Sequence, residues 1–192
     1  LQMGERLWIC PSWTHPPNPK AINILLDPGL AFGTGTHPTT AMCLRALDGD
    51  LPPGQRVVDY GCGSGILGIA AARLGATAVL GVDNDPQAIT ASRDNAQRNE
   101  VPDAAFRVVL PQDDLVASWQ ASADWVVANI LAGPLVALGP ALTSLMVPGG
   151  RLLLAGLLVD QAQEVIEAYA PRVALSIADQ QEEGVLLAGE KC

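Results

Sequence analysis

The sequence predicts an α/β fold in which one mostly parallel, seven-stranded sheet is covered by helices on both faces. Two observations lead to this prediction. Short apolar runs typical of buried strands alternate along the chain with longer segments of helical periodicity. The first strand of this alternating region also runs into a glycine-rich turn that leads directly into a helix. Both features are typical of a parallel sheet whose strands are joined by helices.

The segment before the alternating region contains little regular structure. Residues 11–20 are rich in proline and polar groups and predict a surface loop, and residues 22–26 predict a short strand. Asp27 to Thr40 form a loop rich in glycine and threonine, DPGLAFGTGTHPTT, and a helix is expected from there to about Leu47. The proline and glycine residues of segment 51–54 then end this helix.

From residue 56 onward, strands and helices are expected in turn. The predicted strands cover 56–60, 78–82, 105–110, 124–128, 150–156 and the regions near 172–178 and 184–189. The predicted helices cover 64–74, 86–98, 159–170 and the regions near 114–119 and 131–146. Because no helix separates the last two strands, they should pair antiparallel. Open sheets of this kind bind ligands outside the carboxyl ends of their strands, so a site is expected at that edge.

Composition narrows the possible partners. The chain has 192 residues, of which 49% are hydrophobic, and this is enough for one domain that buries roughly 70% of its unfolded surface. The net charge of −9 would repel phosphate backbones, so nucleic acid is not expected as a direct partner, whereas a basic protein or a cationic ligand is compatible. No apolar run approaches the ~18 residues of a membrane span, and no membrane partner is expected.

Cysteine and histidine usage favours neither a metal site nor a disulfide framework. The four cysteines, at positions 10, 43, 62 and 192, form no C-x-x-C pair, and there are only two histidines. This usage is typical of reduced thiols in a cytoplasmic protein.

The glycine-rich turn carries Gly61, Gly63 and Gly65, which permit close approach of the backbone to a ligand. Counted from Gly61, position 66 is isoleucine rather than the third glycine of the dinucleotide fingerprint. Together with Asp59, the pattern D-x-G-x-G-x-G resembles the first motif of Rossmann-like methyltransferases and favours S-adenosylmethionine over a nicotinamide cofactor. Asp59 could orient the ammonium of the methionine part or could satisfy local backbone donors, and the turn itself could be an ordinary connection.

Two aspartates compete for the ribose of such a cofactor. Asp83 follows the second core strand, about 20 residues after the glycine turn, where a carboxylate can accept hydrogen bonds from ribose hydroxyls. Asp85 precedes Pro86, an arrangement that favours an N-cap with proline at the first helical position. We expect no such local role for Asp83, and we therefore assign the ribose to Asp83.

Asn129 ends the fourth core strand and is the candidate catalytic residue. Its amide carbonyl could hold an attacking amine beside the transferring methyl group, and its alternative role is to cap the next helix. His37 is interpreted as a capping residue more readily than as a base, and Thr39 or Thr40 could contact the cofactor. Asp113 and Asp114 could meet the adenine amino group, or could cap the short helix near 114–119.

Five segments together resemble one family of methyltransferases over essentially the whole chain. They are GERLWICPSW, LDPGLAFGTGTHPTT, DYGCGSGILGIAA, GVDNDPQAI and VVANILAGPL. They resemble the PrmA family, the bacterial methyltransferases of large-subunit ribosomal protein eleven. The resemblance implies a class I methyltransferase fold, S-adenosylmethionine as cofactor, and cofactor contacts at Thr40, Gly61, Asp83 and Asn129. It also implies methyl transfer to lysine side chains and to the N-terminal amine of that ribosomal protein.

The resemblance also implies a domain organisation. Members of the family usually carry a separate N-terminal domain that recognises the ribosomal protein, and this domain is expected to be absent from this chain. We assign residues 1–40 to a lead-in segment with the glycine/threonine loop, and residues 41–192 to the catalytic core. Alternative functions are methylation of another protein or of a small-molecule amine, and a non-catalytic cofactor-binding module. A nicotinamide oxidoreductase is the least favoured because of Ile66.

Overall fold

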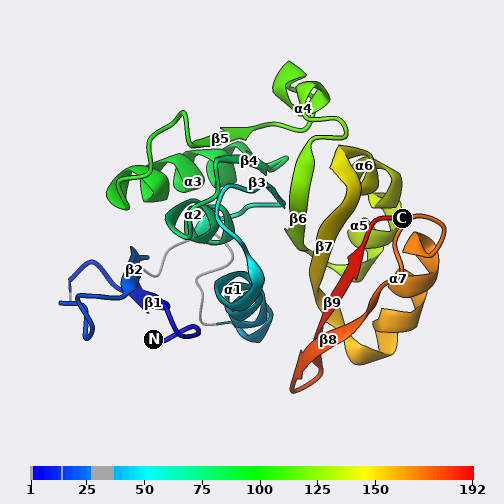
Figure 1. Cartoon of the computed structure of the whole chain (residues 1–192), viewed down its shortest axis with the longest axis horizontal. Coiled ribbons are helices and arrows are strands. Elements are labelled where there is room, and N and C mark those ends of the chain that lie inside the picture. Colours follow the sequence, from blue (N-terminus) through cyan, green and yellow to red (C-terminus); the bar gives the residue numbers. More distant parts are fainter. Residues whose placement is uncertain (1, 14, 27–36) are drawn as a thin grey trace.

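The computed structural model describes residues 2–13, 15–26 and 37–192. At its centre is a seven-stranded sheet with the strand order β5-β4-β3-β6-β7-β9-β8 (Figure 1). Its strands are β3 (Arg56–Tyr60), β4 (Ala78–Val82), β5 (Phe106–Val109), β6 (Ala123–Asn129), β7 (Met146–Leu158), β8 (Ser176–Gln181) and β9 (Gly184–Glu190). The first five are parallel to one another, and β9 pairs antiparallel with both β7 and β8. The predicted fold class is therefore confirmed.

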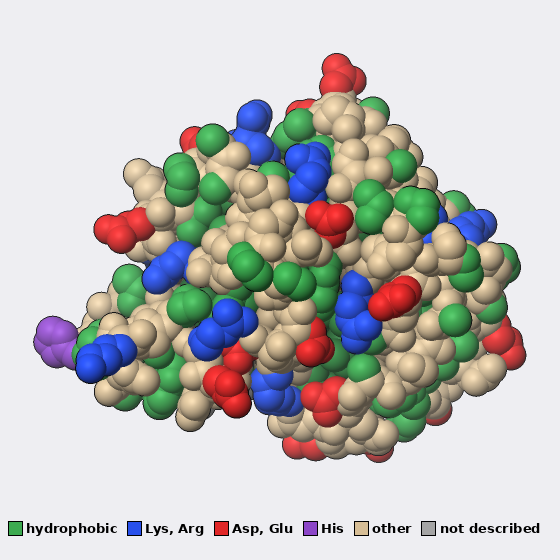
Figure 2. All heavy atoms as spheres, viewed as in Figure 1, with side chains coloured by type: hydrophobic (Ala, Val, Ile, Leu, Met, Phe, Trp, Pro, Cys, Tyr) green, Lys and Arg blue, Asp and Glu red, His purple; other side chains and the backbone are tan. Residues whose placement is uncertain are grey.

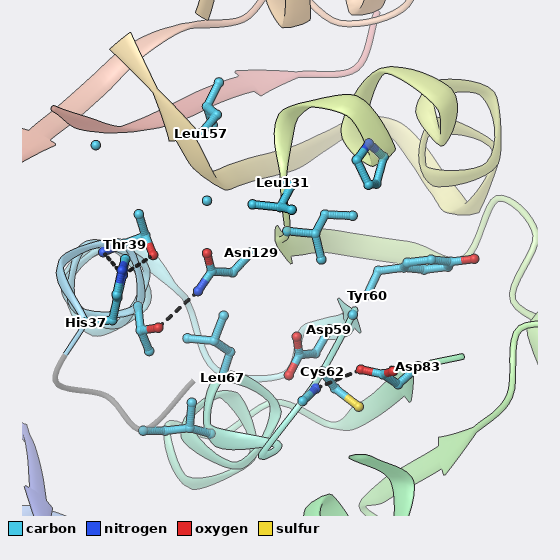
Figure 3. A pocket seen from close by; sticks show the side chains of 18 of the residues that line it. His37, Thr39, Asp59, Tyr60, Cys62, Leu67, Asp83, Asn129, Leu131 and Leu157 are labelled. Atoms are coloured by element: carbon cyan, nitrogen blue, oxygen red, sulfur yellow. Dashed lines mark hydrogen bonds between the residues drawn. The ribbon is translucent and has the colours of Figure 1, made fainter. Parts of the chain in front are cut away.

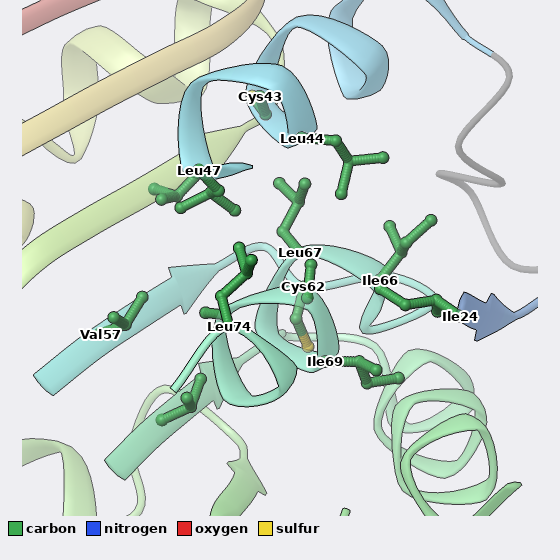
Figure 4. Close-up of a cluster of buried hydrophobic side chains, with 14 of the residues drawn as sticks. Ile24, Cys43, Leu44, Leu47, Val57, Cys62, Ile66, Leu67, Ile69 and Leu74 are labelled. Atoms are coloured by element: carbon green, nitrogen blue, oxygen red, sulfur yellow. The ribbon is translucent and has the colours of Figure 1, made fainter. Parts of the chain in front are cut away.

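Helices cover both faces of the sheet. They are α1 (Pro38–Asp50), α2 (Ile66–Arg73), α3 (Pro86–Arg98), α4 (Asp114–Ser118), α5 (Ala132–Ala137), α6 (Gly139–Leu145) and α7 (Ala162–Tyr169). One hydrophobic layer joins α1, α2 and α3 to the sheet, and a second layer joins α5, α6 and α7 to its other face. Figure 4 shows Leu44 and Leu47 of α1 near Leu67 of α2, with Ile24 at the edge of the cluster.

A buried polar contact joins two helices of the second layer. Tyr169, at the end of α7, is fully buried, and its hydroxyl donates a hydrogen bond of 2.7 Å to the backbone carbonyl of Leu135 in α5. A buried tyrosine hydroxyl normally finds such a partner. The bond fixes α7 against α5 below the carboxyl end of the sheet.

Most predicted elements match, and the differences have local causes. The helix predicted near 131–146 is two helices, because the chain bends at Leu138 before Gly139 and Pro140, and proline cannot donate a helical hydrogen bond. The helix predicted over 159–170 begins as a 3₁₀ turn, η1 (Val159–Gln161). The strand predicted near 172–178 starts later, at Ser176, because residue Val173 forms only an isolated bridge to Lys191.

The lead-in segment packs onto the core through an element that the sequence analysis missed. Strand β1 (Leu7–Cys10) pairs in parallel with the predicted strand β2 (Ile22–Leu25) to form a separate two-stranded sheet. Leu7 and Ile24 are fully buried in the first hydrophobic layer. A four-residue apolar run beside a proline-rich loop carries too weak a pattern to predict such pairing. Residues 27–36 of the predicted glycine/threonine loop lie outside the described residues.

The surface mixes charge types. On the face seen in Figure 2, acidic and basic side chains are interspersed rather than grouped by sign. Within the described part of the chain, no helix is both long enough and apolar enough to cross a membrane.

One buried carboxylate ties the lead-in segment to α1. Asp48 accepts hydrogen bonds from the backbone N–H groups of Glu5 (2.7 Å) and Arg6 (3.1 Å), and its Oδ1 lies 3.4 Å from Nε of Arg6. The carboxylate is nearly inaccessible, whereas the Arg6 side chain is half exposed. The carboxylate thus satisfies donors that would otherwise have no partner.

We expect Asp48→Ala to lower the free energy of unfolding by about 2–4 kcal/mol, because it leaves partly buried donors unsatisfied. The measurement is urea denaturation. Asp50→Ala is the matched control, because Asp50 is exposed on the same helix and should change stability by less than about 0.5 kcal/mol. Equal unfolding midpoints for the two variants would contradict this role of Asp48.

Candidate functional site

A cavity of about 1140 Å³ opens at the carboxyl ends of β3, β4, β6 and β7. This is the edge where the sequence predicts a site. Its wall includes the start of α1, the glycine turn after β3, Asp83 after β4 and Asn129 at the end of β6. In the view of Figure 3, Asn129 lies between Leu131 and Leu157 on one side and Asp59 and Asp83 on the other. The topology therefore brings the main predicted site residues together.

The glycine turn adopts a backbone that other residues rarely adopt. Gly61, Gly63 and Gly65 have φ of 80°, 55° and 83°. A Cβ on Gly65 would lie 2.9 Å from Oγ of Ser92, so this residue also allows α3 to pack closely. Gly61 and Gly63 line the cavity, whereas Gly65 is not among the residues of its wall. Gly65 is the N-cap of α2, and no side chain caps this helix.

Asp59 is a buried carboxylate in the cavity wall. Only 2% of its surface is exposed, and its Oδ2 accepts a hydrogen bond of 3.0 Å from the backbone N–H of Gly68 in α2. Burial raises the pKa of Asp59 to about 7, the Gly68 hydrogen bond opposes this shift, and the nearby Asp83 adds to it. The residue thus satisfies a local backbone donor, as one of the two sequence interpretations expected.

Asp83 has a structural role that the sequence analysis did not expect. Its Oδ2 accepts a hydrogen bond of 3.0 Å from the N–H of Gly63, and its Oδ1 accepts one of 2.9 Å from the N–H of Asp85. The expectation that Asp83 has no local role is therefore wrong, because its carboxylate braces the glycine turn from the neighbouring strand. The predicted capping role of Asp85 is confirmed, since its side chain accepts from the N–H of Gln87 at 2.9 Å.

Asn129 presents a buried acceptor without a partner. Its Nδ2 donates a hydrogen bond of 3.0 Å to Oγ1 of Thr40, which is itself buried. Its Oδ1 is buried and has no hydrogen-bond partner among the described residues. The capping interpretation is wrong, because the N-cap of α5 is Leu131 and no side chain caps that helix. An unsatisfied buried acceptor is uncommon in folded proteins, and this one belongs to a residue of the cavity wall, where a ligand could supply the donor.

The backbone that follows Asn129 is held from two sides. A Cβ on Gly61 would overlap the side chain of Ile130, and a Cβ on Gly156 would overlap the Ile130 backbone. Gly156 has φ of 92° and lies where the pairing of β7 with β9 is irregular. The N–H of Ile130 also donates to the carbonyl of Ala155 at 3.0 Å. Gly156 is not among the predicted site residues, although an isolated glycine inside a strand indicates a close backbone approach.

The remaining candidates have structural roles. His37 caps α1, since its Nδ1 lies 3.3 Å from the N–H of Thr39 and 2.8 Å from Oγ1 of Thr39. Asp113 caps α4 through the N–H of Leu115 and is not part of the main cavity wall. All four cysteines are free thiols. Among residues 2–13, 15–26 and 37–192, no group of three or more His, Cys, Asp or Glu side chains could hold a metal ion.

Comparisons with known proteins show which family this chain resembles. The family described as ribosomal protein L11 methyltransferase (PrmA) matches residues 1–191. A ribosomal protein L11 methyltransferase of Marinobacter nauticus is 56% identical over 191 residues, which cover all of this chain and 63% of that protein. The chain therefore spans less than two thirds of this relative.

Solved structures agree as well. The crystal structure of a ribosomal protein L11 methylase from Lactobacillus delbrueckii subsp. bulgaricus matches with a TM-score of 0.85 and 31% identity, covering 100% of this chain and 97% of that one. A putative methyltransferase, SMU.776, solved in complex with SAH, matches with a TM-score of 0.65 over 86% of this chain and 52% of that one. Its 16% identity shows a shared fold only.

The raised pKa of Asp59 predicts how stability depends on pH. The pKa is about 7 in the folded protein against an ordinary value of 3.8, so between about pH 4 and 7 the folded state binds more protons than the unfolded state. The unfolding free energy should therefore fall as pH rises through this window, by at most about 4 kcal/mol. Asp59→Asn, which still offers an oxygen to Gly68, should remove this fall. Urea denaturation from pH 4 to 8 without ligand tests this, and parallel curves for the two proteins would refute it.

Proposed function

Because the chain belongs to the ribosomal protein L11 methyltransferase (PrmA) family, we propose that it is the catalytic part of a protein methyltransferase that uses S-adenosylmethionine. The proposed substrate is ribosomal protein L11, and the proposed acceptors are its lysine side chains and its N-terminal amine. The observation that carries this proposal is the unpartnered Oδ1 of Asn129 inside a large cavity. The PrmA relatives support the protein substrate.

The cavity wall fits the proposed cofactor. Its volume of about 1140 Å³ exceeds the roughly 300–1,000 Å³ that is typical for small-molecule sites, so it can take a nucleoside cofactor and an acceptor group together. Gly61 and Gly63 bring backbone to the wall without a side chain, and Asp83 is only partly buried beside them. We assign Asp83 to the ribose hydroxyls. Gly65 remains part of the proposed cofactor site. It does not line the cavity, but its positive φ lets the turn enter α2.

The polar residues of the wall suit a cation. S-Adenosylmethionine supplies an electrophilic methyl group on a sulfonium and also carries an ammonium. We assign the ammonium to Asp59, whose buried carboxylate has a single backbone donor from Gly68. Thr40 holds the Asn129 amide in place and completes the wall opposite the glycine turn.

The role of Asn129 in the proposed reaction is to orient the acceptor amine. Its Oδ1 can accept a hydrogen bond from the amine N–H, which aims the nitrogen lone pair at the reacting carbon. A lysine amine has an ordinary pKa of ~10.4, so the neutral form costs about 4.6 kcal/mol at pH 7. A dry site next to a cation lowers the pKa of the amine and reduces this cost. No side-chain base is then required.

The proposal includes a domain division and a location. Residues 1–40 form the lead-in segment with the glycine/threonine loop, and residues 41–192 form the catalytic core. A cytoplasmic site of action fits a modifier of ribosomal proteins and agrees with four free thiols. The net charge of −9 favours a basic protein partner over direct contact with nucleic acid.

Two measurements test the proposal as a whole. Titration calorimetry should show binding of S-adenosylmethionine and none of NAD. Mass spectrometry of ribosomal protein L11 incubated with the chain and the cofactor should then show added methyl groups on amines. Binding of NAD alone, or cofactor binding with no methylation at high L11 concentration, would overturn the proposed activity.

We expect Asp83→Ala to weaken cofactor binding at least about tenfold, because it removes charge-assisted hydrogen bonds to the ribose and the brace on Gly63. Asp85→Ala is the matched control. It removes only the α3 cap, so it should lower stability by about 1 kcal/mol and leave the dissociation constant unchanged. Calorimetry measures the affinities, and the reverse pattern would show that the ribose assignment is wrong.

Replacing Asn129 separates orientation of the amine from cofactor binding. We expect Asn129→Ala to reduce kcat roughly 100-fold while changing cofactor affinity much less, because misplaced reactants lose rate rather than binding. Thr40→Val keeps the amide but removes its partner Oγ1, so its effect on kcat should be smaller. Single-turnover kinetics at saturating substrate provide the measurement. Near-normal turnover of Asn129→Ala would rule out this role.

A further inference from the structure

The cavity continues beyond Asn129, away from the glycine turn and Asp83. This part of the wall comes from the start of α5, the end of β7 and the turn between β8 and β9. Its residues include Leu131, Leu158, Glu182 and Glu183. None of them has a role in the cofactor site described above. We name this part, defined by these four residues, the entrance lobe.

Two leucines of the entrance lobe are exposed. Leu131 is 70% exposed and Leu158 is 46% exposed, although both line the cavity. Leu157, the next residue to Leu158, is instead buried in the second hydrophobic layer. Large apolar side chains on the rim of a cavity favour a ligand with an apolar portion. The methylene chain of a lysine has this character.

Two glutamates complete the entrance lobe. Glu182 and Glu183 form the turn between β8 and β9, and both are exposed. Neither carboxylate has an ion pair or a hydrogen bond with a described residue, whereas Asp179 on the same hairpin lies 3.6 Å from Arg45. The backbone of the turn is fixed to the end of β7, because the N–H of Val159 donates to the carbonyl of Glu183 at 2.8 Å. The turn thus holds two uncompensated negative charges at the mouth of the cavity.

We infer that the entrance lobe receives an extended basic segment of a protein and selects acceptor lysines that have cationic neighbours. The lysine methylenes lie against Leu131 and Leu158, and Glu182 and Glu183 attract the flanking positive charges. The charges of this mouth disfavour phosphate-bearing ligands. The inference rests on the proposed amine methylation and adds the residues that choose among amines. We assign the attraction to this local pair, because neither carboxylate has an ion pair with a described residue.

The test uses two peptides and two double variants of the chain. One ten-residue peptide carries a single lysine flanked by two arginines, and in the other peptide glutamines replace the arginines. The variant is Glu182→Gln with Glu183→Gln. The control is Glu100→Gln with Asp103→Asn, which changes the net charge equally at exposed residues outside the cavity. Fluorescence anisotropy measures peptide binding with and without S-adenosylhomocysteine, so the readout does not depend on methyl transfer.

The glutamate variant should bind the arginine peptide about three- to tenfold more weakly than the control variant does. It should bind the glutamine peptide equally well, and the difference should disappear at about 1 M salt. Equal loss in both double variants, or equal loss for both peptides, would overturn the role of the glutamates. Tight binding of single-stranded RNA instead of the peptide would also overturn the inference.

A second matched pair of variants tests the apolar side of the entrance lobe. Leu158→Ser should weaken both peptides, whereas Val159→Ser should weaken neither, because Val159 is also exposed but does not line the cavity. If the two variants bind the peptides with equal affinity, the leucines have no part in peptide binding. If the peptides bind as expected but wild-type protein methylates neither, the proposed activity fails while the entrance lobe stands as a binding site.

Discussion

The hydrogen bond from Nδ2 of Asn129 to Oγ1 of Thr40 leaves the amide oxygen of Asn129 as the group that is available to a ligand in the cavity. An amide has a donor end and an acceptor end, and this bond occupies the donor end with α1. The acceptor end therefore faces the cavity, where no described residue satisfies it. A single contact between two distant segments thus fixes which end of this amide a ligand can use.

This contact needs a rigid backbone beneath it. Gly61 and Gly156 approach Ile130 so closely that neither could carry a side chain. The irregular pairing of β7 with β9 places Gly156 against Ile130, and such irregularities often re-aim residues beside functional sites. The turn after β3 and strand β7 therefore hold the residue that follows β6 from two sides.

Local patterns predicted the fold better than they predicted the contacts. Strands β3 and β4 match the predicted ranges to the residue, because short buried apolar runs end at clear turn signals. The orientation of Asn129 depends on Thr40, which is 89 residues away, and the bracing by Asp83 depends on Gly63 in the neighbouring strand's turn. Such pairings follow from tertiary structure and leave no periodic signal. The glycines show the same limit of sequence-based prediction. A glycine is needed at position 156 because the Ile130 backbone lies against it, and this contact is visible only in the structure.

The electrostatics of the two parts of the cavity differ in kind. Asp59 is buried, its pKa is raised to about 7, and a cation placed beside it would favour its ionised form. Glu182 and Glu183 lie in solvent, where salt weakens each interaction and a single charge contributes little. The buried carboxylate therefore suits tight binding of a small cation, whereas the exposed pair suits only weak selection among peptide segments. For the proposed activity, strong preference for one protein then requires a second contact, which raises the effective concentration of the proposed acceptor amine. The greater length of the Marinobacter relative leaves room for such a contact outside the part that this chain covers.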